Sequence, residues 1–130
     1  MLLILRGAAL VLLDLEFIVN LDKPTQISKI IFGSLFNPAM RILPAGGVAV
    51  EVSADGKQYT PVAEKALKHD YPETGRIAFT DSIEFEPTQA TFLKVKIKNG
   101  GTLRNGVNFE KNNGPEVIPA ELWIDEIEAY

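Results

Sequence analysis

Residues that could carry out acid–base chemistry are few in this chain. Glu84 and Glu86 are two positions apart, so on a strand they share one face about 7 Å apart. That spacing lies within the range that the carboxyl pair of a glycosidase uses. However, they flank Phe85 on a short run that ends at Pro87, and nothing nearby gives the two carboxyls different roles. We therefore predict a solvated strand face.

The acids near the C-terminus, Asp125, Glu126 and Glu128, are interpreted in the same way. A Ca²⁺ ion needs six to eight oxygen ligands, and no D-x-D-x-D run supplies them. The sequence therefore predicts no metal site and no cofactor.

Nucleophilic and zinc chemistry also lack their usual residues. The chain has no cysteine and a single histidine, His69. No G-x-S-x-G motif or second histidine at zinc-ligand spacing accompanies it. Because His69 lies in a polar segment beside Asp70 and Tyr71, we expect a surface residue. We predict that the chain is not an enzyme. The alternative, a small enzyme, would need a set of catalytic residues that the sequence does not show.

The segment most typical of a binding loop is residues 99–119, NGGTLRNGVNFEKNNGPEVIP, which is long, polar and rich in turn residues. Structureless loops beyond about 12 to 15 residues are uncommon in compact domains and are often functional.

Composition limits the other possibilities. A chain of 130 residues with 46% hydrophobic content is expected to form one domain. The net charge of −4 gives no basic patch for nucleic acid. Residues 1–13 are apolar around Arg6, too short to span a bilayer and without a cleavage site. We predict an arm packed on the domain or the stub of a longer chain; a signal remnant and a membrane role remain open.

Alternating hydrophobicity predicts the elements that must position these residues. Leu13–Leu21 and Phe92–Lys98 alternate cleanly, which is typical of half-buried strands. In the second, Leu93, Val95 and Ile97 should point inward, while the three lysines between and after them should be solvated and should protect a sheet edge. Residues 27–35 form an apolar strand, and Asp22–Thr25 is predicted to be a turn.

Further patterns complete an all-β prediction. Residues 48–53 alternate before Asp55-Gly56, which favours a two-residue hairpin turn and a return strand over residues 59–63. Short strands are expected over residues 77–79 and 82–85, and Glu64–Asp70 is the one helical candidate. Ile124 and Ile127 cannot share a face of a regular strand, so a bulge is expected between them. Seven or eight short strands with turn signals favour an antiparallel β-sandwich.

Four stretches in this order resemble the discoidin family, also called the coagulation factor V/VIII type C domain, which overlaps the family 32 carbohydrate-binding modules. They are DLEFIVNLDKPTQISKI, VAVEVSADGKQY, ATFLKVKIKNGGTL and ELWIDEIEAY. The chain resembles in particular the C-terminal domains of secreted bacterial glycosidases of the β-N-acetylhexosaminidase (chitobiase) type. This resemblance implies a discoidin-like, galactose-binding-like jelly roll over residues 14–130.

The resemblance implies a non-catalytic carbohydrate-binding module, the accessory domain of a secreted glycoside hydrolase. Its partners would be a galactose- or N-acetylhexosamine-containing glycan and a linked catalytic domain, with no nucleic acid and no membrane span. Its location would be extracellular, periplasmic or on the surface of a bacterium. The alternative is a structural or protein-interaction domain of the same fold without a sugar site.

In this family the ligand binds to loops at one end of the sandwich. The aromatic platform would be Phe109 or Phe36, although Phe36 and Trp123 are rather expected in the core. The hydrogen-bonding candidates are Arg41, Arg104, Asn105, Asn108 and Asn112. Two features depart from the family: the N-terminal region that often carries calcium is absent or replaced by residues 1–13, and the Trp-His pair of relatives is missing from residues 103–109.

Overall fold

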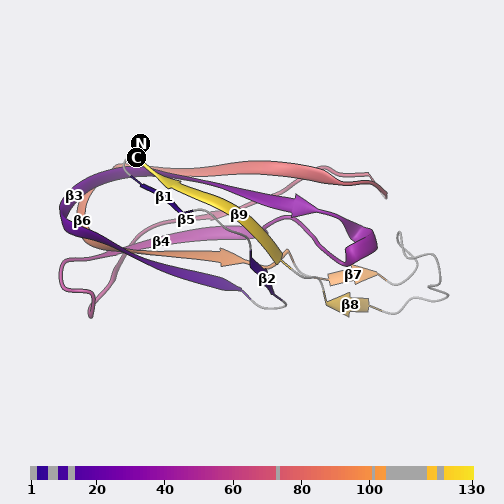
Figure 1. Ribbon diagram of the computed structural model, residues 1–130, viewed down its shortest axis with the longest axis horizontal. Helices are drawn as coiled ribbons and strands as arrows, with labels where there is room; N and C mark the ends of the chain where they lie inside the picture. Colours follow the sequence, from indigo (N-terminus) through magenta and orange to yellow (C-terminus); the bar gives the residue numbers. More distant parts are fainter. Residues whose placement is uncertain are drawn as a thin grey trace.

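The computed structural model describes residues 3–5, 9–11, 14–72, 74–100, 102–104, 117–119 and 122–130, with side chains in 14–72, 74–100 and 122–130. These residues form strands and one 3₁₀ turn, without an α-helix, which confirms the all-β prediction (Figure 1). The elements are β1 (Leu3–Leu5), β2 (Ala9–Val11), β3 (Leu15–Phe36), η1 (Pro38–Met40), β4 (Gly47–Ser53), β5 (Thr60–Ala66), β6 (Ile77–Lys98), β7 (Thr102–Arg104), β8 (Val117–Pro119) and β9 (Leu122–Ala129).

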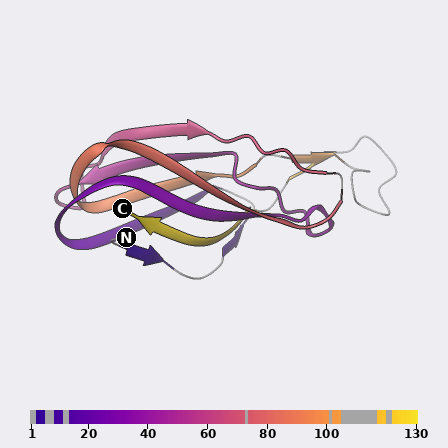
Figure 2. The same cartoon turned by 90° about the horizontal axis from the view of Figure 1, so that it is seen from above.

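The two longest strands, β3 and β6, have 22 residues each and pair with one another along most of their length. The main sheet has the antiparallel order β1-β9-β3-β6-β4-β5, with β2 also on β9, while β7 pairs with β8 in a separate sheet. The β3–β6 ribbon folds back on itself (Figures 1 and 2), so both strands contribute to two layers. This confirms the predicted β-sandwich.

The predicted turn at Asp22–Thr25 marks the place where the ribbon folds over. The pairing of β3 with β6 shifts register between Asn20 and Thr25. Asp22 has a φ of 71°, and its N–H donates to Asn20 Oδ1 at 2.8 Å. Because β6 bends together with β3, pairing resumes beyond the bend. The strands that the sequence predicts separately on either side are therefore halves of one strand.

The core lies between the two layers and is apolar. In β6, Leu93, Val95 and Ile97 are at most 1% exposed, as the alternation predicts. They pack in one cluster with residues such as Phe32 and Ile30 of β3. Burying each such side chain contributes about 1.5 to 3 kcal/mol, so this cluster is a principal source of the sandwich's stability.

The lysines of β6 do not protect a sheet edge, because β6 lies between β3 and β4 in the middle of the sheet. That prediction is wrong. Instead each lysine lies beside a carboxylate of another strand of the sheet, namely β3, β4 or β5, and we call this set the lysine ladder. Its pairs are Lys94–Glu16 at 3.4 Å, Lys96–Glu51 at 2.7 Å and Lys98–Glu64 at 3.3 Å. The hydrogen bond and charge of Glu51 raise the pKa of Lys96.

The predicted helix at Glu64–Asp70 is wrong, since its first residues belong to β5 and pair with β4. Pairing with an existing strand overrides the weak helical preference of so short a segment.

The hairpin between β4 and β5 is wider than predicted, because the last pair is Val52 with Thr60. Gly56 does have the expected positive φ of 77°. The Asp55 carboxylate accepts the N–H groups of Lys57 and Gln58 at 2.8 and 3.0 Å, which lowers its pKa. This side chain closes a loop longer than a two-residue turn.

The predicted bulge in β9 is confirmed. Phe32 pairs with Ile127 and Ser34 with Ile124, so Gly33 alone faces the two residues Asp125 and Glu126. The extra residue lets Ile124 and Ile127 both reach the core, at 2% and 3% exposure. Consequently, the two acids lie next to each other on the outer side of the sheet.

At the N-terminus, β1 pairs with residues 127–129 of β9 and β2 with residues 122–124. The division into an arm over residues 1–13 and a sandwich over residues 14–130 stays a prediction.

Candidate functional site

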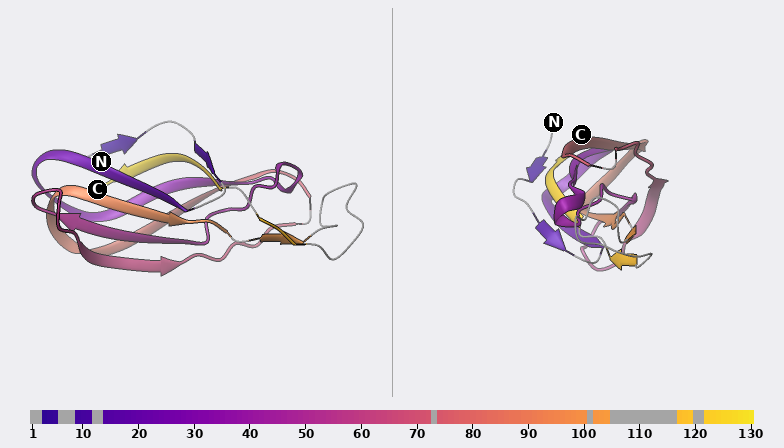
Figure 3. Two further views of the ribbon diagram at one scale, coloured as in Figure 1. Left: turned by 90° about the horizontal axis from the view of Figure 1, so that it is seen from below. Right: turned by 90° about the vertical axis from the view of Figure 1, so that its right-hand side faces the viewer.

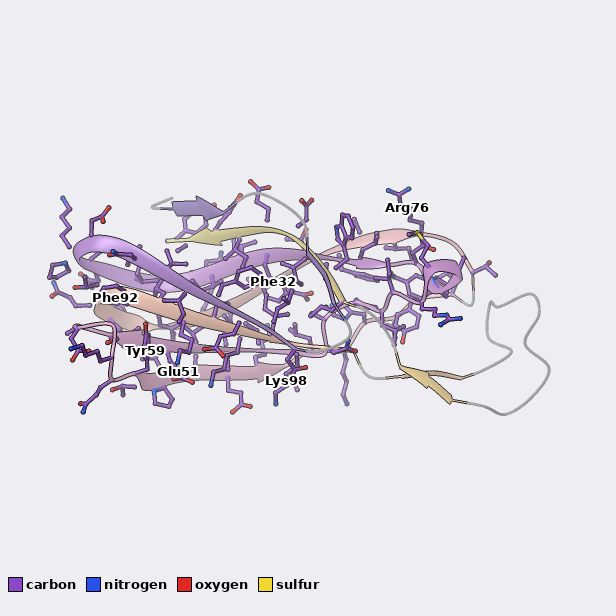
Figure 4. The ribbon with its side chains drawn as sticks, turned by 60° about the horizontal axis from the view of Figure 1, so that its bottom comes forward. Phe32, Glu51, Tyr59, Arg76, Phe92 and Lys98 are labelled. Atoms are coloured by element: carbon purple, nitrogen blue, oxygen red, sulfur yellow. The ribbon has the colours of Figure 1, made fainter. Side chains whose placement is uncertain are left out.

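A cavity of about 570 Å³ lies on the outer side of the layer formed by β9, β3 and the first half of β6. We call it the outer groove and define it by the residues Ile31, Gly33, Leu35, Thr80, Trp123 and Asp125. These residues alternate with core residues such as Phe32 and Ile124, so they face away from the core (Figure 4 shows Phe32 between the layers).

Gly33 accounts for the hollow in the floor of the groove. It lies on the central strand β3, between Thr80 of β6 on one side and the bulge of β9 on the other. A Cβ atom at Gly33 would meet Asp125 Cβ and the Phe79 carbonyl oxygen at 3.7 Å, which is ordinary contact. Position 33 lies between the outward-facing Ile31 and Leu35 and has no side chain of its own. This leaves space for a ligand.

Trp123 forms one wall of the outer groove and is only partly buried. The expectation that it belongs to the core is wrong. Leu122 and Ile124 occupy the inward positions at 0% and 2% exposure, so the residue between them must face outward. The alternation of residues 122–124 in the sequence already indicates this outward position of Trp123.

The end of the outer groove is closed by Met40 of η1, which is 57% exposed, and by the exposed Arg76 just before β6 (Figure 4). Among the side chains that the structure describes, neither Arg76 nor Asp125 forms an ion pair. Glu128 accepts a hydrogen bond from the Tyr130 hydroxyl at 2.7 Å, which raises the pKa of Tyr130.

His69 lies inside the sandwich rather than on its surface, so that prediction is wrong. Its side chain is 7% exposed, and its Nε2 lies 2.8 Å from Asp81 Oδ2. Asp81 pairs with Phe32 across the ribbon and therefore faces inward, where a carboxylate requires a partner. The His69 ring also packs against Phe79, with ring centroids 4.6 Å apart.

Phe36 is 1% exposed, which confirms the expectation that it belongs to the core rather than serving as a platform. Tyr71 stacks on it with ring centroids 4.4 Å apart. Together with the His69–Asp81 pair, this contact holds the segment before β6 against the end of the sandwich.

Most of the predicted loop site lies outside the described residues, namely Asn105, Asn108, Phe109 and Asn112. Arg104 ends β7, where only the backbone is described. Arg41 is exposed and caps η1 with a φ of 63°. The turn η1 and strand β7 lie at the same end of the molecule (Figures 1 and 3). This set therefore stays a prediction.

Glu84 and Glu86, the acid pair considered in the sequence, are both exposed. Glu84 pairs with Lys29 at 3.5 Å. No group of three or more metal-ligating side chains occurs in the part of the chain that the structure describes. Nor does that part contain a helix long and apolar enough to cross a membrane.

Comparison with known proteins finds similarity in structure only. No family model and no curated protein matches the sequence. A solved pectin binding carbohydrate binding module superimposes with a TM-score of 0.53 at 21% identity, over 95% of this chain and 70% of that one. The module CpGH89CBM32-6, produced by Clostridium perfringens, gives 0.51 at 15% identity, over 90% and 68%. The chain has the discoidin-like fold of carbohydrate-binding modules.

The resemblance seen in the sequence is thus confirmed at the level of the fold. The C-terminal domain of a chitobiase from Bacteroides fragilis is less similar, with a TM-score of 0.42 at 14% identity, over 90% of this chain and 64% of that one. The chain spans about two thirds of the length of the solved modules that it matches.

Proposed function

We propose that this chain is a non-catalytic carbohydrate-binding module and that the outer groove is its glycan site. The observation that carries the proposal is that a partly exposed indole, Trp123, lines the same groove as the side-chain-free position Gly33. The fold, which it shares with a solved carbohydrate binding module, supports a carbohydrate as the ligand.

The chemistry of the groove suits a sugar ring. A pyranose has an apolar C–H surface and a rim of hydroxyl groups, and Trp123 offers an apolar face of matching kind. The Thr80 hydroxyl and the Asp125 carboxylate lie on opposite sides of Gly33 and can bond to ring hydroxyls. The volume lies within the range of about 300 to 1,000 Å³ typical of small-molecule sites.

The biological role follows from the resemblance of the sequence motifs. The chain would be the accessory domain of a secreted bacterial glycoside hydrolase of the chitobiase type, acting outside the cell or at its surface. It would hold a linked catalytic domain near a galactose- or N-acetylhexosamine-containing glycan. The benefit would come from effective concentration rather than from tight binding by one site.

A glycan array with the purified chain, Trp123→Ala and Tyr59→Ala tests the proposal. Tyr59 is a matched control, because it is a partly buried aromatic residue that lies over the lysine ladder, with Lys94 Nζ 4.1 Å from its ring centre. We expect Trp123→Ala to weaken binding about tenfold or more, or about 1.4 kcal/mol, and Tyr59→Ala to bind like the parent.

Two other outcomes are informative once circular dichroism shows that each variant is folded. If the parent chain binds no glycan on the array, the proposed function is contradicted and a structural or protein-interaction domain is favoured. Binding that survives Trp123→Ala but is lost in Phe109→Ala would keep the function and move the site to the predicted loop.

A further inference from the structure

We infer that the outer groove selects glycans that carry a free amine, such as glucosamine oligosaccharides, over neutral ones and rejects polyuronates. The inference rests on the proposed function and adds the chemical class of the ligand. Its basis is the distribution of charge among the described residues that line the groove, which include the carboxylates of Asp125, Glu126 and Glu128 and the guanidinium of Arg76.

The bulge in β9 places two acidic residues next to each other along the groove. In a regular strand, successive residues point to opposite faces, so only one of two adjacent acids would face the ligand. Here Asp125 and Glu126 both lie opposite Gly33 and both line the groove. A ligand resting on Gly33 therefore lies beside the exposed carboxylate of Asp125.

The carboxylate of Asp125 remains available to a ligand. It is exposed and forms no ion pair with another described side chain. Described acids on other parts of the sheet, Glu16, Glu51, Glu64 and Glu84, each lie within 3.5 Å of a lysine nitrogen. An ammonium group on a sugar would supply the missing counter-charge through charge-assisted hydrogen bonds.

Arg76 does not reverse this preference, because it lies at the far end of the groove. The pairing of Phe36 with Ile77 places Arg76 level with Asn37, four residues along β3 from Gly33. At about 3.3 Å per residue, the separation along the strand is about 13 Å. A polyuronate carries a carboxylate on every ring, so a chain with one ring beside Arg76 would bring others against the acids.

Isothermal titration with three tetrasaccharides tests the inference: a glucosamine tetramer, its N-acetylated and hence neutral counterpart, and a galacturonate tetramer. The titrations are made at about pH 5.5, in low and in high salt. We expect the glucosamine tetramer to bind about tenfold tighter than the neutral one, with the difference shrinking in high salt. The galacturonate tetramer should not bind measurably.

Asp125→Asn and Glu84→Gln provide matched variants, since each removes one exposed carboxylate and Glu84 lies outside the outer groove. Asp125→Asn should bring the glucosamine and neutral tetramers to similar affinity, while Glu84→Gln should keep the preference. Three results would overturn the inference but leave the proposed function standing. They are equal affinity of the parent for all three tetramers, tighter binding of galacturonate, and a preference for glucosamine that survives Asp125→Asn. No binding by any of the three, together with silence on the glycan array, would refute the proposed function itself.

Discussion

The lysine ladder and the outer groove lie on outward faces that the same two strands, β3 and β6, help to form (Figures 1 and 4). In the ladder, every lysine of β6 has a carboxylate partner within 3.4 Å. In the outer groove, Asp125 and Arg76 have no such partner among the described side chains.

The floors of the two regions differ as well. The ladder is built on alternating lysines that reach diagonally to acids on β3, β4 and β5, which is an ordinary way to stabilise the exposed face of a sheet. The outer groove has a glycine on its central strand and a bulge on the next strand. A bulge and a strand glycine stabilise a sheet less than regular pairing, and their coincidence at an open hollow agrees with the glycan site proposed there.

The largest expected effect comes from filling the hollow. In Gly33→Leu, the first carbon is accommodated, since its nearest neighbours lie 3.7 Å away, and the rest of the side chain occupies the space of the sugar. We expect glycan binding to fall about 100-fold, equivalent to about 2.8 kcal/mol, measured by titration calorimetry. The midpoint of thermal unfolding should hold or rise, because glycine weakens a strand interior. Unchanged affinity in this variant would place the ligand elsewhere.

A second variant compares the buried His69–Asp81 hydrogen bond with the ion pairs of the lysine ladder. His69→Ala leaves the Asp81 carboxylate, itself 15% exposed, without its 2.8 Å partner. We expect a loss of about 1 to 3 kcal/mol in the free energy of unfolding, because a buried acceptor is left unsatisfied. Urea denaturation measures it, and the double variant with Asp81→Asn should recover part of the loss. If the losses in the free energy of unfolding of the two single variants simply added in the double variant, His69 and Asp81 would have no energetic coupling.

The smallest effect is expected within the ladder. Lys94→Met removes the pair with Glu16 and the contact with the Tyr59 ring but keeps an apolar stem. The loss in the free energy of unfolding should be about 0.2 to 1 kcal/mol, seen by the same denaturation, with unchanged glycan affinity. Weaker glycan binding in this variant would mean that the ladder, too, contacts the ligand.

Local patterns in the sequence predict features that depend on neighbouring residues. The inward set Leu93, Val95 and Ile97 follows from alternation, and the bulge follows from the spacing of Ile124 and Ile127. Both succeed because one face of each strand must be buried, which fixes the register. The sandwich as a whole follows from the number of such strands.

Features that depend on contacts between residues far apart in the sequence cannot be predicted from such local patterns. The continuity of β3 through Asp22–Thr25 requires that β6 bends beside it, and the burial of His69 requires Asp81, which is 12 residues away in sequence. The outer groove joins Gly33, Thr80 and Trp123 from three strands. Only the outward position of Trp123 was already implied by its own strand.

A nuclear magnetic resonance titration of the labelled chain tests whether the outer groove is the glycan site. The ligands are the N-acetylglucosamine tetramer and its de-acetylated form. If the outer groove binds the glycan, backbone amide shifts should concentrate in residues 31–35, 78–80 and 123–128, while residues 94–98 of the ladder stay unchanged. Shifts confined to Arg41 and residues 99–119, or to the ladder, would contradict the assignment of the site to the outer groove.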